Sequence, residues 1–137
     1  SVLTLMSLDS VIDKNFISVS PDLPLRKLVN VISNSHTSFI PVVDTAGTLL
    51  GEIDITKIRH IMFRTELYNR FNVSQLTTPP PAILGVSDPM EEVMDTFDKS
   101  NANYLPVVDI DQHLIGFIDR TRLYSLYRKT VADFSNE

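Results

Sequence analysis

The sequence FIPVVD at residues 39–44 occurs again as YLPVVD at residues 104–109, 65 positions further along the chain. The same spacing relates GEIDIT at 51–56 to GFIDRT at 116–121, and no gap is needed between 24–56 and 89–121. The chain therefore contains two copies of one unit. A duplicated unit of this size normally buries its apolar face against its sibling, so we expect the pair to be the functional object.

The composition limits the class of protein. A chain of 137 residues fits one compact domain or two tightly packed half-domains, and 43% apolar residues can build an ordinary core. The net charge of −5 gives no electrostatic reason to expect nucleic-acid binding, and the absence of cysteine excludes disulfides and thiol chemistry. No apolar run approaches the roughly 18–20 residues that span a bilayer. Because the chain starts at Ser1 and shows no signal peptide, we expect a fragment of a longer protein.

The first copy has the pattern strand, helix, strand, strand, helix. A short apolar strand is predicted at 16–19, and Pro24 suits the first turn of a helix. The apolar residues of that helix recur at i, i+3, i+4 and i+7, which is one face of an amphipathic helix. A hairpin is predicted from 39–43 and 48–53 with Gly47 in its turn, and Asp54 can cap the next helix. The apolar positions of the two helices are Leu25, Leu28, Val29, Ile32, Ile55, Ile58, Ile61 and Met62.

The second copy repeats this order. Strands are predicted at 83–86, 104–108 and 114–118, a helix follows Pro89, and Asp119 caps the last helix. The turn at 109–112 lacks the glycine of the first copy, so we expect a looser or different turn there. The apolar positions of the two helices are Met90, Val93, Met94, Phe97, Leu123, Leu126, Tyr127 and Val131.

These patterns divide the chain into three parts and define an α+β fold. Residues 1–63 hold a lead-in helix at 2–8 and the first repeat, 64–75 form a connector, and 76–137 hold the second repeat. The three prolines at 79–81 favour an extended, semi-rigid link between the copies. The lead-in helix is expected to pack on the repeat.

The pattern h-P-V-V-D, turn, L-x-G-x-I and capped helix, present twice, resembles the CBS domain, and the resemblance covers essentially the whole chain. It implies two β-α-β-β-α repeats packed sheet to sheet about a pseudo-twofold axis, with two clefts between them. Such pairs, called Bateman modules, commonly form dimers and act as regulatory appendages.

A narrower resemblance concerns the segments around the repeats. The sequence IRHIMFRTELY at 58–68 with VSQL at 73–76, and VLTLMSLDSVI at 2–12, is similar to the CBS pairs of bacterial CLC chloride channels and transporters, particularly those of the Bacteroidetes type. This implies a module on the cytoplasmic side of the inner membrane, attached to the transmembrane domain of the same polypeptide. The fragment itself is not expected to span the membrane.

The family resemblance also implies a nucleotide cleft for AMP, ADP or ATP. In ligand-binding members an aspartate accepts hydrogen bonds from the ribose hydroxyls, a task that suits a carboxylate. This chain has Lys57 and Arg122 at that place, and Asp54 and Asp119 where Thr or Ser is usual. A cation cannot accept those hydrogen bonds but can contact phosphate. The alternatives are solvated helix surface or i+3 ion pairs for the cations, and N-caps for the two aspartates.

The cleft would be completed by the residues that precede the second strand of each repeat. The first copy has Thr37 and Ser38 there, and the second copy has Ala102 and Asn103. Nucleotide-binding CLC members can carry an aromatic residue there that stacks on adenine, so Thr37 and Ala102 remove that contact. Tyr104 is expected to point into the core.

Catalysis and a metal site are not expected. His36, His60 and His113 lie in a loop, a helix and a turn, without the spacing of a metal pair. The adjacent Glu91 and Glu92 fall in a first helical turn, where the helix dipole favours them. The sequence also lacks nucleophile-elbow, Walker A and dinucleotide motifs.

Three functions remain open. The first is a regulatory and dimerisation module of a CLC-type chloride channel or transporter. The second is an adenine-nucleotide sensor on another transporter or an enzyme. The third is a structural dimerisation module with empty clefts, which the two missing ribose carboxylates favour. In each case the partner is a second copy or the rest of the polypeptide, not a nucleic acid.

Overall fold

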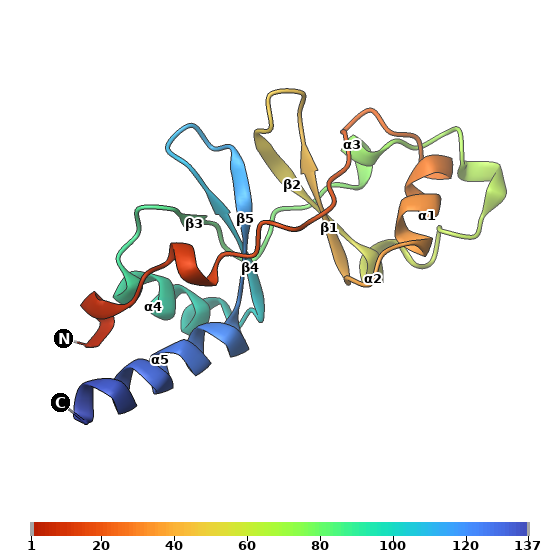
Figure 1. The fold of residues 1–137 in the computed structure, drawn as a ribbon. Helices are drawn as coiled ribbons and strands as arrows, with labels where there is room; N and C mark the ends of the chain where they lie inside the picture. Colours follow the sequence, from red (N-terminus) through yellow and green to blue (C-terminus); the bar gives the residue numbers. More distant parts are fainter. Residues whose placement is uncertain (1, 137) are drawn as a thin grey trace. The chain divides into compact units, whose positions relative to one another are not determined.

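The computed structural model describes residues 2–136, and its contacts divide the chain into two compact units (Figure 1). The first-repeat unit is Ile17–Pro79, and the second-repeat unit combines Ser1–Phe16 with Pro80–Glu137. Both mix helices and strands, which confirms the predicted α+β class. Packing of the two sheets about a pseudo-twofold axis stays a prediction, as does the division at 63/64 and 75/76.

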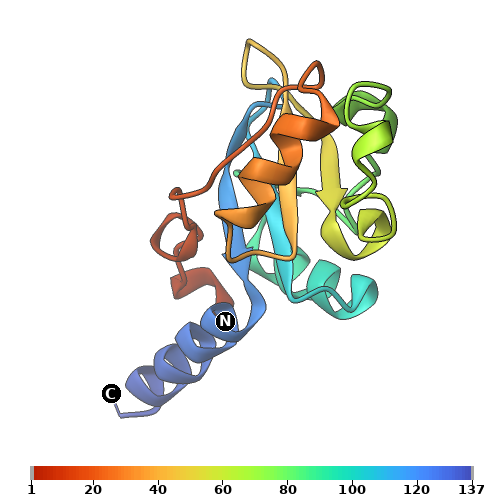
Figure 2. The same cartoon turned by 90° about the vertical axis from the view of Figure 1, so that its right-hand side faces the viewer.

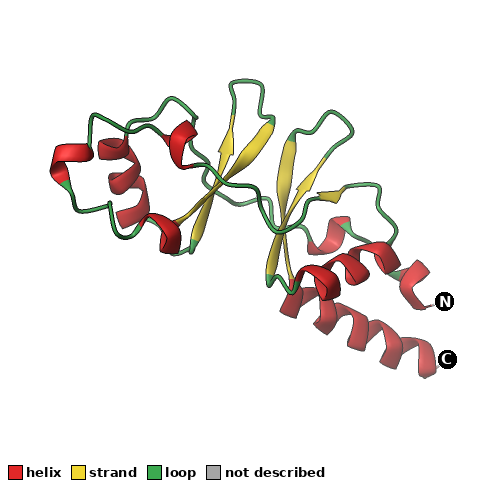
Figure 3. Cartoon of the chain, turned by 180° about the vertical axis from the view of Figure 1, so that it is seen from behind, coloured by secondary structure: helices red, strands yellow, loops and turns green. Residues whose placement is uncertain are grey.

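The first-repeat unit places helices to one side of a hairpin (Figure 3). Helix α1 (Leu25–Ser33) precedes strands β1 (Phe39–Val43) and β2 (Leu49–Asp54), which pair antiparallel and lead into α2 (Ile55–Ile58). The 3-10 turn η3 (Thr65–Leu67) and helix α3 (Val73–Leu76) complete it. The fully buried core residues of this unit are Leu25, Leu28, Ile40, Val42, Ile53 and Val73.

The second-repeat unit has a three-stranded sheet. Strand β3 (Leu84–Gly85) runs parallel to β4 (Tyr104–Val108), which pairs antiparallel with β5 (Leu114–Asp119). Along the chain, helix α4 (Met90–Ser100) follows β3 and precedes β4, and α5 (Arg120–Ser135) follows β5 (Figure 1). The fully buried core residues are Leu84, Val93, Phe97, Leu105, Val107, Ile118 and Leu123.

The strand predicted at 16–19 does not form. Only Val19 joins the first-repeat sheet, through its N–H to the Pro41 carbonyl and its carbonyl to the Val43 N–H, both at 3.0 Å. Phe16 instead packs edge-on against Phe117, with ring centroids 5.6 Å apart. The aromatic contact holds Phe16 in the other unit, so the first sheet keeps two strands.

The predicted lead-in helix at 2–8 is also corrected. The structure has two 3-10 turns, η1 (Val2–Leu5) and η2 (Asp9–Val11), which lie beside α5 in Figures 1 and 2. Leu3, Met6 and Leu8 pack against the core of the second-repeat unit, not of the first. The connector is likewise more structured than predicted, because Leu67 and Phe71 pack against the first core and Asn72 and Gln75 form a capping box on α3.

The two hairpin turns share one geometry, although a different second turn was predicted. In each, the aspartate Oδ1 accepts two backbone N–H bonds: from Ala46 and Thr48 onto Asp44, and from the equivalent residues onto Asp109. These bonds lower the pKa of both aspartates. Gln112 adopts the left-handed backbone of Gly47, with φ of 68° against 88°. The aspartate bonds therefore hold the turn without the glycine.

A glycine in each return strand allows another segment to cross it closely. The backbone of Asp13 pairs with Phe117, and the backbone of Thr78 pairs with Glu52, by two hydrogen bonds each. A Cβ atom on Gly116 would collide with the Asp13 carbonyl oxygen, and one on Gly51 would lie 2.8 Å from that of Thr78. The glycines of the repeated L-x-G-x-I pattern are thus required by these crossings.

We predict that Gly116→Ala lowers the free energy of unfolding by about 2–3 kcal/mol, because the added methyl group must displace a paired backbone. Urea unfolding followed by circular dichroism measures the change. Gly85→Ala is the matched control, since its Cβ would meet only the side chain of Asp88 and should cost less. An equal loss in both variants would contradict the crossing as the cause.

Candidate functional site

The residues predicted for the first half of the nucleotide cleft lie at the end of the first hairpin that is away from its turn. Phe39 pairs with Asp54 across the hairpin, and the Ser38 carbonyl accepts a 3.0 Å hydrogen bond from the Ile55 N–H. Thr37 and Ser38 therefore lie beside the start of α2, which also carries Lys57. We call Thr37, Ser38, Asp54 and Lys57 the first half-site.

The second repeat builds the same arrangement from its own residues. Tyr104 pairs with Asp119, and the Asn103 carbonyl accepts a 2.9 Å bond from the Arg120 N–H. We call Ala102, Asn103, Asp119 and Arg122 the second half-site. Each half-site lies entirely within its own unit.

The two aspartates are helix caps, as one of the sequence-based alternatives predicts. Asp54 Oδ1 accepts from the Thr56 N–H at 3.0 Å and from its hydroxyl at 2.6 Å. Asp119 Oδ1 accepts from the Thr121 N–H at 2.8 Å and from the Arg122 N–H at 3.4 Å. Satisfying the free N–H groups of a helix start stabilises the helix, typically by about 1 kcal/mol.

The two cations are exposed. Within residues 2–136, neither Lys57 nor Arg122 forms an ion pair, so the i+3 pairs with Asp54 and Asp119 are not formed. Each cation lies in the first turn of a helix. The carboxylate beside it already accepts hydrogen bonds from the N–H groups of that helix start. The half-sites therefore offer charged donors to an anionic ligand.

Thr37 and Ala102, which precede the second strand of each repeat, have local structural roles. The Thr37 hydroxyl donates to the Phe39 carbonyl at 2.7 Å and lies 2.9 Å from the Ser35 hydroxyl. Ala102 is buried at 9% exposure and provides no stacking surface. The Thr37 hydroxyl is thus used within its own loop, and Ala102 is part of the buried interior.

Tyr104 does not point into the core. Its ring stacks on Phe117, with centroids 5.1 Å apart and planes 6° apart, and its hydroxyl donates to Asp13 Oδ2 at 3.4 Å. Burial and the Asp13 carboxylate raise the pKa of Tyr104. Side chains alternate along a strand, so Leu105 and Val107 enter the core while Tyr104 lies on the other face. This alternation was the signal that sequence reasoning missed.

Glu52 is a further residue that the sequence analysis did not single out. It lies on β2, where the second repeat has the apolar Phe117. Burial, and then the carboxylate of Asp54, raise the pKa of Glu52 to about 7, while Lys57 lowers it. The sequence contained a signal for Glu52, because the other repeat has an aromatic ring at the equivalent position.

The second hairpin turn brings Asp109, Asp111 and His113 together, although no metal site was predicted. One ligand atom of each lies within 4.8 Å of the others, and His113 Nδ1 lies 3.2 Å from Asp109 Oδ2. The turn itself accounts for Asp109, because Asp44 makes the same backbone bonds in the first turn, where Ala46 and Thr48 replace the other two.

The sequence matches the family model of the CBS domain twice, at residues 8–64 and 73–129. The chain belongs to the CBS domain family and is a tandem pair of these domains. Within residues 2–136, no helix is both long and apolar enough to cross a bilayer.

Curated relatives carry this pair as a minor part. The chain is 29% identical over 110 residues to inosine-5'-monophosphate dehydrogenase of Methanocaldococcus jannaschii, covering 80% of this chain and 21% of that protein. It is 24% identical over 118 residues to the carnitine transport ATP-binding protein OpuCA of Listeria monocytogenes, covering 85% and 28%. The chain thus spans less than a third of the length of each of these relatives.

Solved structures share the fold. The chain matches CbpB in complex with c-di-AMP with a TM-score of 0.79 at 14% identity, covering 96% of this chain and 91% of that one. It matches CBSX2 in complex with AMP with a TM-score of 0.66 at 21% identity, covering 94% and 96%.

We predict that Glu52 makes stability fall as the pH rises. Because its pKa is raised from 4.5 to about 7 in the folded chain, the folded state keeps a proton that the unfolded state loses. Stability from this group is highest below pH 4.5 and declines until about pH 7. Glu52→Gln should therefore flatten the dependence of the urea midpoint on pH between about pH 5 and 7.5. Above about pH 7.5 the variant should have a higher urea midpoint than the wild type.

Glu66→Gln is the control for this prediction. Glu66 is exposed and its pKa is lowered, so it is ionised in both states across that range and its removal should leave the slope unchanged. An unchanged slope in Glu52→Gln would assign the pH dependence to other groups.

Proposed function

We propose that this CBS pair is a regulatory and dimerisation module of a CLC-type chloride channel or transporter, on the cytoplasmic side of the membrane. The observation that carries the regulatory role is the chemistry of the half-sites. The carboxylates of Asp54 and Asp119 accept from helix-start N–H groups, and the exposed cations Lys57 and Arg122 form no ion pair in the described chain, which leaves the cations available to an anion. The resemblance of residues 2–12, 58–68 and 73–76 supports the CLC host, and the transport relative supports a membrane-transport setting.

The mechanism is differential binding. A ligand that prefers one arrangement of the two repeats favours that arrangement by the difference in its binding free energies. The transmembrane domain of the same polypeptide responds through the same coupling, and a shift in the conformational equilibrium of that domain in turn changes ligand affinity. No catalytic step is part of this function.

We infer that the ligand is an adenine nucleotide, AMP, ADP or ATP, with its phosphates on Lys57 or Arg122. An exposed lysine or arginine is a suitable donor to phosphate, whereas neither can accept the ribose hydroxyl hydrogens. The fold shared with the c-di-AMP and AMP complexes supports this ligand class. Phosphate contact thus takes the place of ribose recognition.

We predict that ATP binds this chain more tightly than adenosine does in calorimetric titration, because the cations contact only the phosphates. The variant Lys57→Ala/Arg122→Ala should weaken ATP roughly tenfold and leave adenosine unchanged. Lys57→Asp/Arg122→Asp should weaken ATP further but strengthen adenosine, since a carboxylate accepts from ribose hydroxyls.

Lys129→Ala, which removes an exposed cation from α5, is the matched control and should leave both affinities unchanged. The absence of heat with AMP, ADP and ATP at millimolar concentration would contradict nucleotide sensing. That result would favour the ligand-free dimerisation module.

We also predict that the gene encoding this chain specifies a chloride-transporting membrane domain. Reconstitution of the complete protein in liposomes should give chloride flux, and ATP should change its rate, with the alanine pair Lys57→Ala/Arg122→Ala losing that response. A metal-ion transporter, or a catalytic domain such as a nucleotide-metabolising enzyme, would refute the CLC host and leave the sensing module on another protein.

A further inference from the structure

Glu52 lies beside the first half-site and uses none of its acceptor atoms within the described chain. It is half-buried on β2, two residues before Asp54, and side chains two positions apart along a strand lie on the same face. Its carboxylate feels the charges of Asp54 and of Lys57 on α2. Within residues 2–136 it forms neither an ion pair nor a hydrogen bond. Its two oxygens are therefore available to a ligand.

The residue opposite Glu52 is Thr78, whose hydroxyl is also unused. Two backbone hydrogen bonds of 2.9 Å pair the two residues as antiparallel neighbours, so their side chains lie on the same face. The Thr78 Oγ1 atom is buried and has no hydrogen-bond partner in the described chain. Because buried polar groups nearly always have a partner, this hydroxyl calls for one. The crossing thus places a free hydroxyl and a free carboxylate side by side.

A vicinal diol fits these two groups. An ionised carboxylate accepts hydrogen bonds from two neighbouring hydroxyls, and a threonine hydroxyl can donate to one of them or accept from it. Lys57, whose charge acts on Glu52, is suited to phosphate instead. A nucleotide carries its diol and its phosphates on one sugar, so it can reach an acceptor on β2 and a cation on α2 together.

The second repeat does not build this pair of groups. Phe117 occupies the position of Glu52, and its ring stacks on Tyr104. Asp13 occupies the position of Thr78, and its Oδ2 accepts from the Tyr104 hydroxyl at 3.4 Å. The equivalent place in the second-repeat unit is therefore filled by an aromatic contact, and the two half-sites differ in their capacity to bind a diol.

We propose that Glu52 and Thr78 bind the ribose diol of the nucleotide in the first half-site, while Lys57 contacts its phosphates. The acceptor that is missing at position 57 is thus supplied from the neighbouring strand. This inference rests on the nucleotide proposed above as the ligand. It adds a specificity for the sugar, because a nucleotide without the 2′ and 3′ hydroxyls loses these contacts.

The diol contact should strengthen as the pH rises through about 7. Burial, and then the carboxylate of Asp54, raise the pKa of Glu52 to about 7, while Lys57 lowers it. The other segments paired with this residue, β1 and 77–79, carry no charged side chain. A protonated carboxyl keeps a proton on one oxygen and accepts less well, so the ionised form is the one that holds both hydroxyls.

Calorimetric titration with ATP and with 2′,3′-dideoxy-ATP tests the diol contact. The two ligands share base and triphosphate, so the ratio of their Kd values cancels the phosphate contacts and the titration of the phosphates. An Arg122→Ala background restricts the measurement to the first half-site. There ATP should bind at least about tenfold more tightly at about pH 8, and the ratio should fall toward one at about pH 5.5.

Glu52→Gln should reduce the ratio to below about threefold and remove its dependence on pH, because a neutral amide accepts more weakly and does not titrate. Thr78→Val should reduce the ratio by a smaller factor. Far-UV circular dichroism and the urea midpoint check that both variants are folded. Glu66→Gln, which removes an exposed carboxylate of the same unit, should leave the ratio unchanged.

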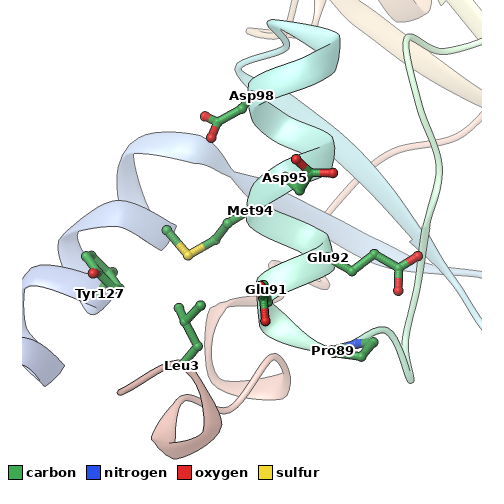
Figure 4. Close-up of a pocket in the computed structure, with 8 residues that line it drawn as sticks. All are labelled: Leu3, Pro89, Glu91, Glu92, Met94, Asp95, Asp98 and Tyr127. Atoms are coloured by element: carbon green, nitrogen blue, oxygen red, sulfur yellow. The ribbon is translucent and has the colours of Figure 1, made fainter. Parts of the chain in front are cut away.

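A groove in the second-repeat unit offers other carboxylates, and it provides a second control. A cavity of about 680 Å³ lies between α4, η1 and α5 (Figure 4). Its described lining has no cation, so it repels the phosphates of a nucleotide. Glu91→Gln should therefore also leave the ratio unchanged. The carboxylates of the lining are Glu91, Glu92, Asp95 and Asp98.

Two results would overturn the role of Glu52 alone: equal affinities for ATP and 2′,3′-dideoxy-ATP at about pH 8, or a ratio that Glu52→Gln leaves unchanged. A ratio that falls in Glu91→Gln instead would assign the diol to the groove and reject the site on β2. The absence of heat with both nucleotides would reject nucleotide sensing itself, and this inference with it.

Discussion

The structure depends on two short backbone crossings. Residue 13 lies near the start of the first repeat and pairs with β5 of the second, while the equivalent residue, 78, lies near the start of the second repeat and pairs with β2 of the first. Each crossing passes over a glycine, because a Cβ there would collide with the crossing carbonyl. Each lead-in thus completes the unit of the other repeat, and the second-repeat unit is built from two separate segments of the chain.

These crossings also place the groups around the candidate sites. Asp13 is held beside Tyr104, and Phe16 meets Phe117, so an aromatic group forms outside the core of the second-repeat unit. The first-repeat unit has Glu52 at the position of Phe117, and burial there raises its pKa. The duplicated fold therefore surrounds its two half-sites with different chemistry.

Much of the fold was predictable from sequence because its signals are local. The repeated PVVD and Gly-x-Ile segments gave both hairpins, and Asp54 and Asp119 were identified as possible caps. The prediction of a different second turn was wrong, because the aspartate bonds hold Gln112 in the left-handed conformation without a glycine. The strand at 16–19 failed for a non-local reason, the attraction of Phe16 to a ring about a hundred positions away.

The sequence by itself determined the duplication, the membership of an α+β family and the substitution of two cations for the ribose carboxylates. All three are properties of residue order and spacing. The tertiary structure alone decided which repeat each lead-in joins, that Lys57 and Arg122 remain without ion pairs in the described chain, and that Glu91 and Glu92 border a groove. The physical reason is that backbone pairing, desolvation and charge compensation depend on which distant segments meet.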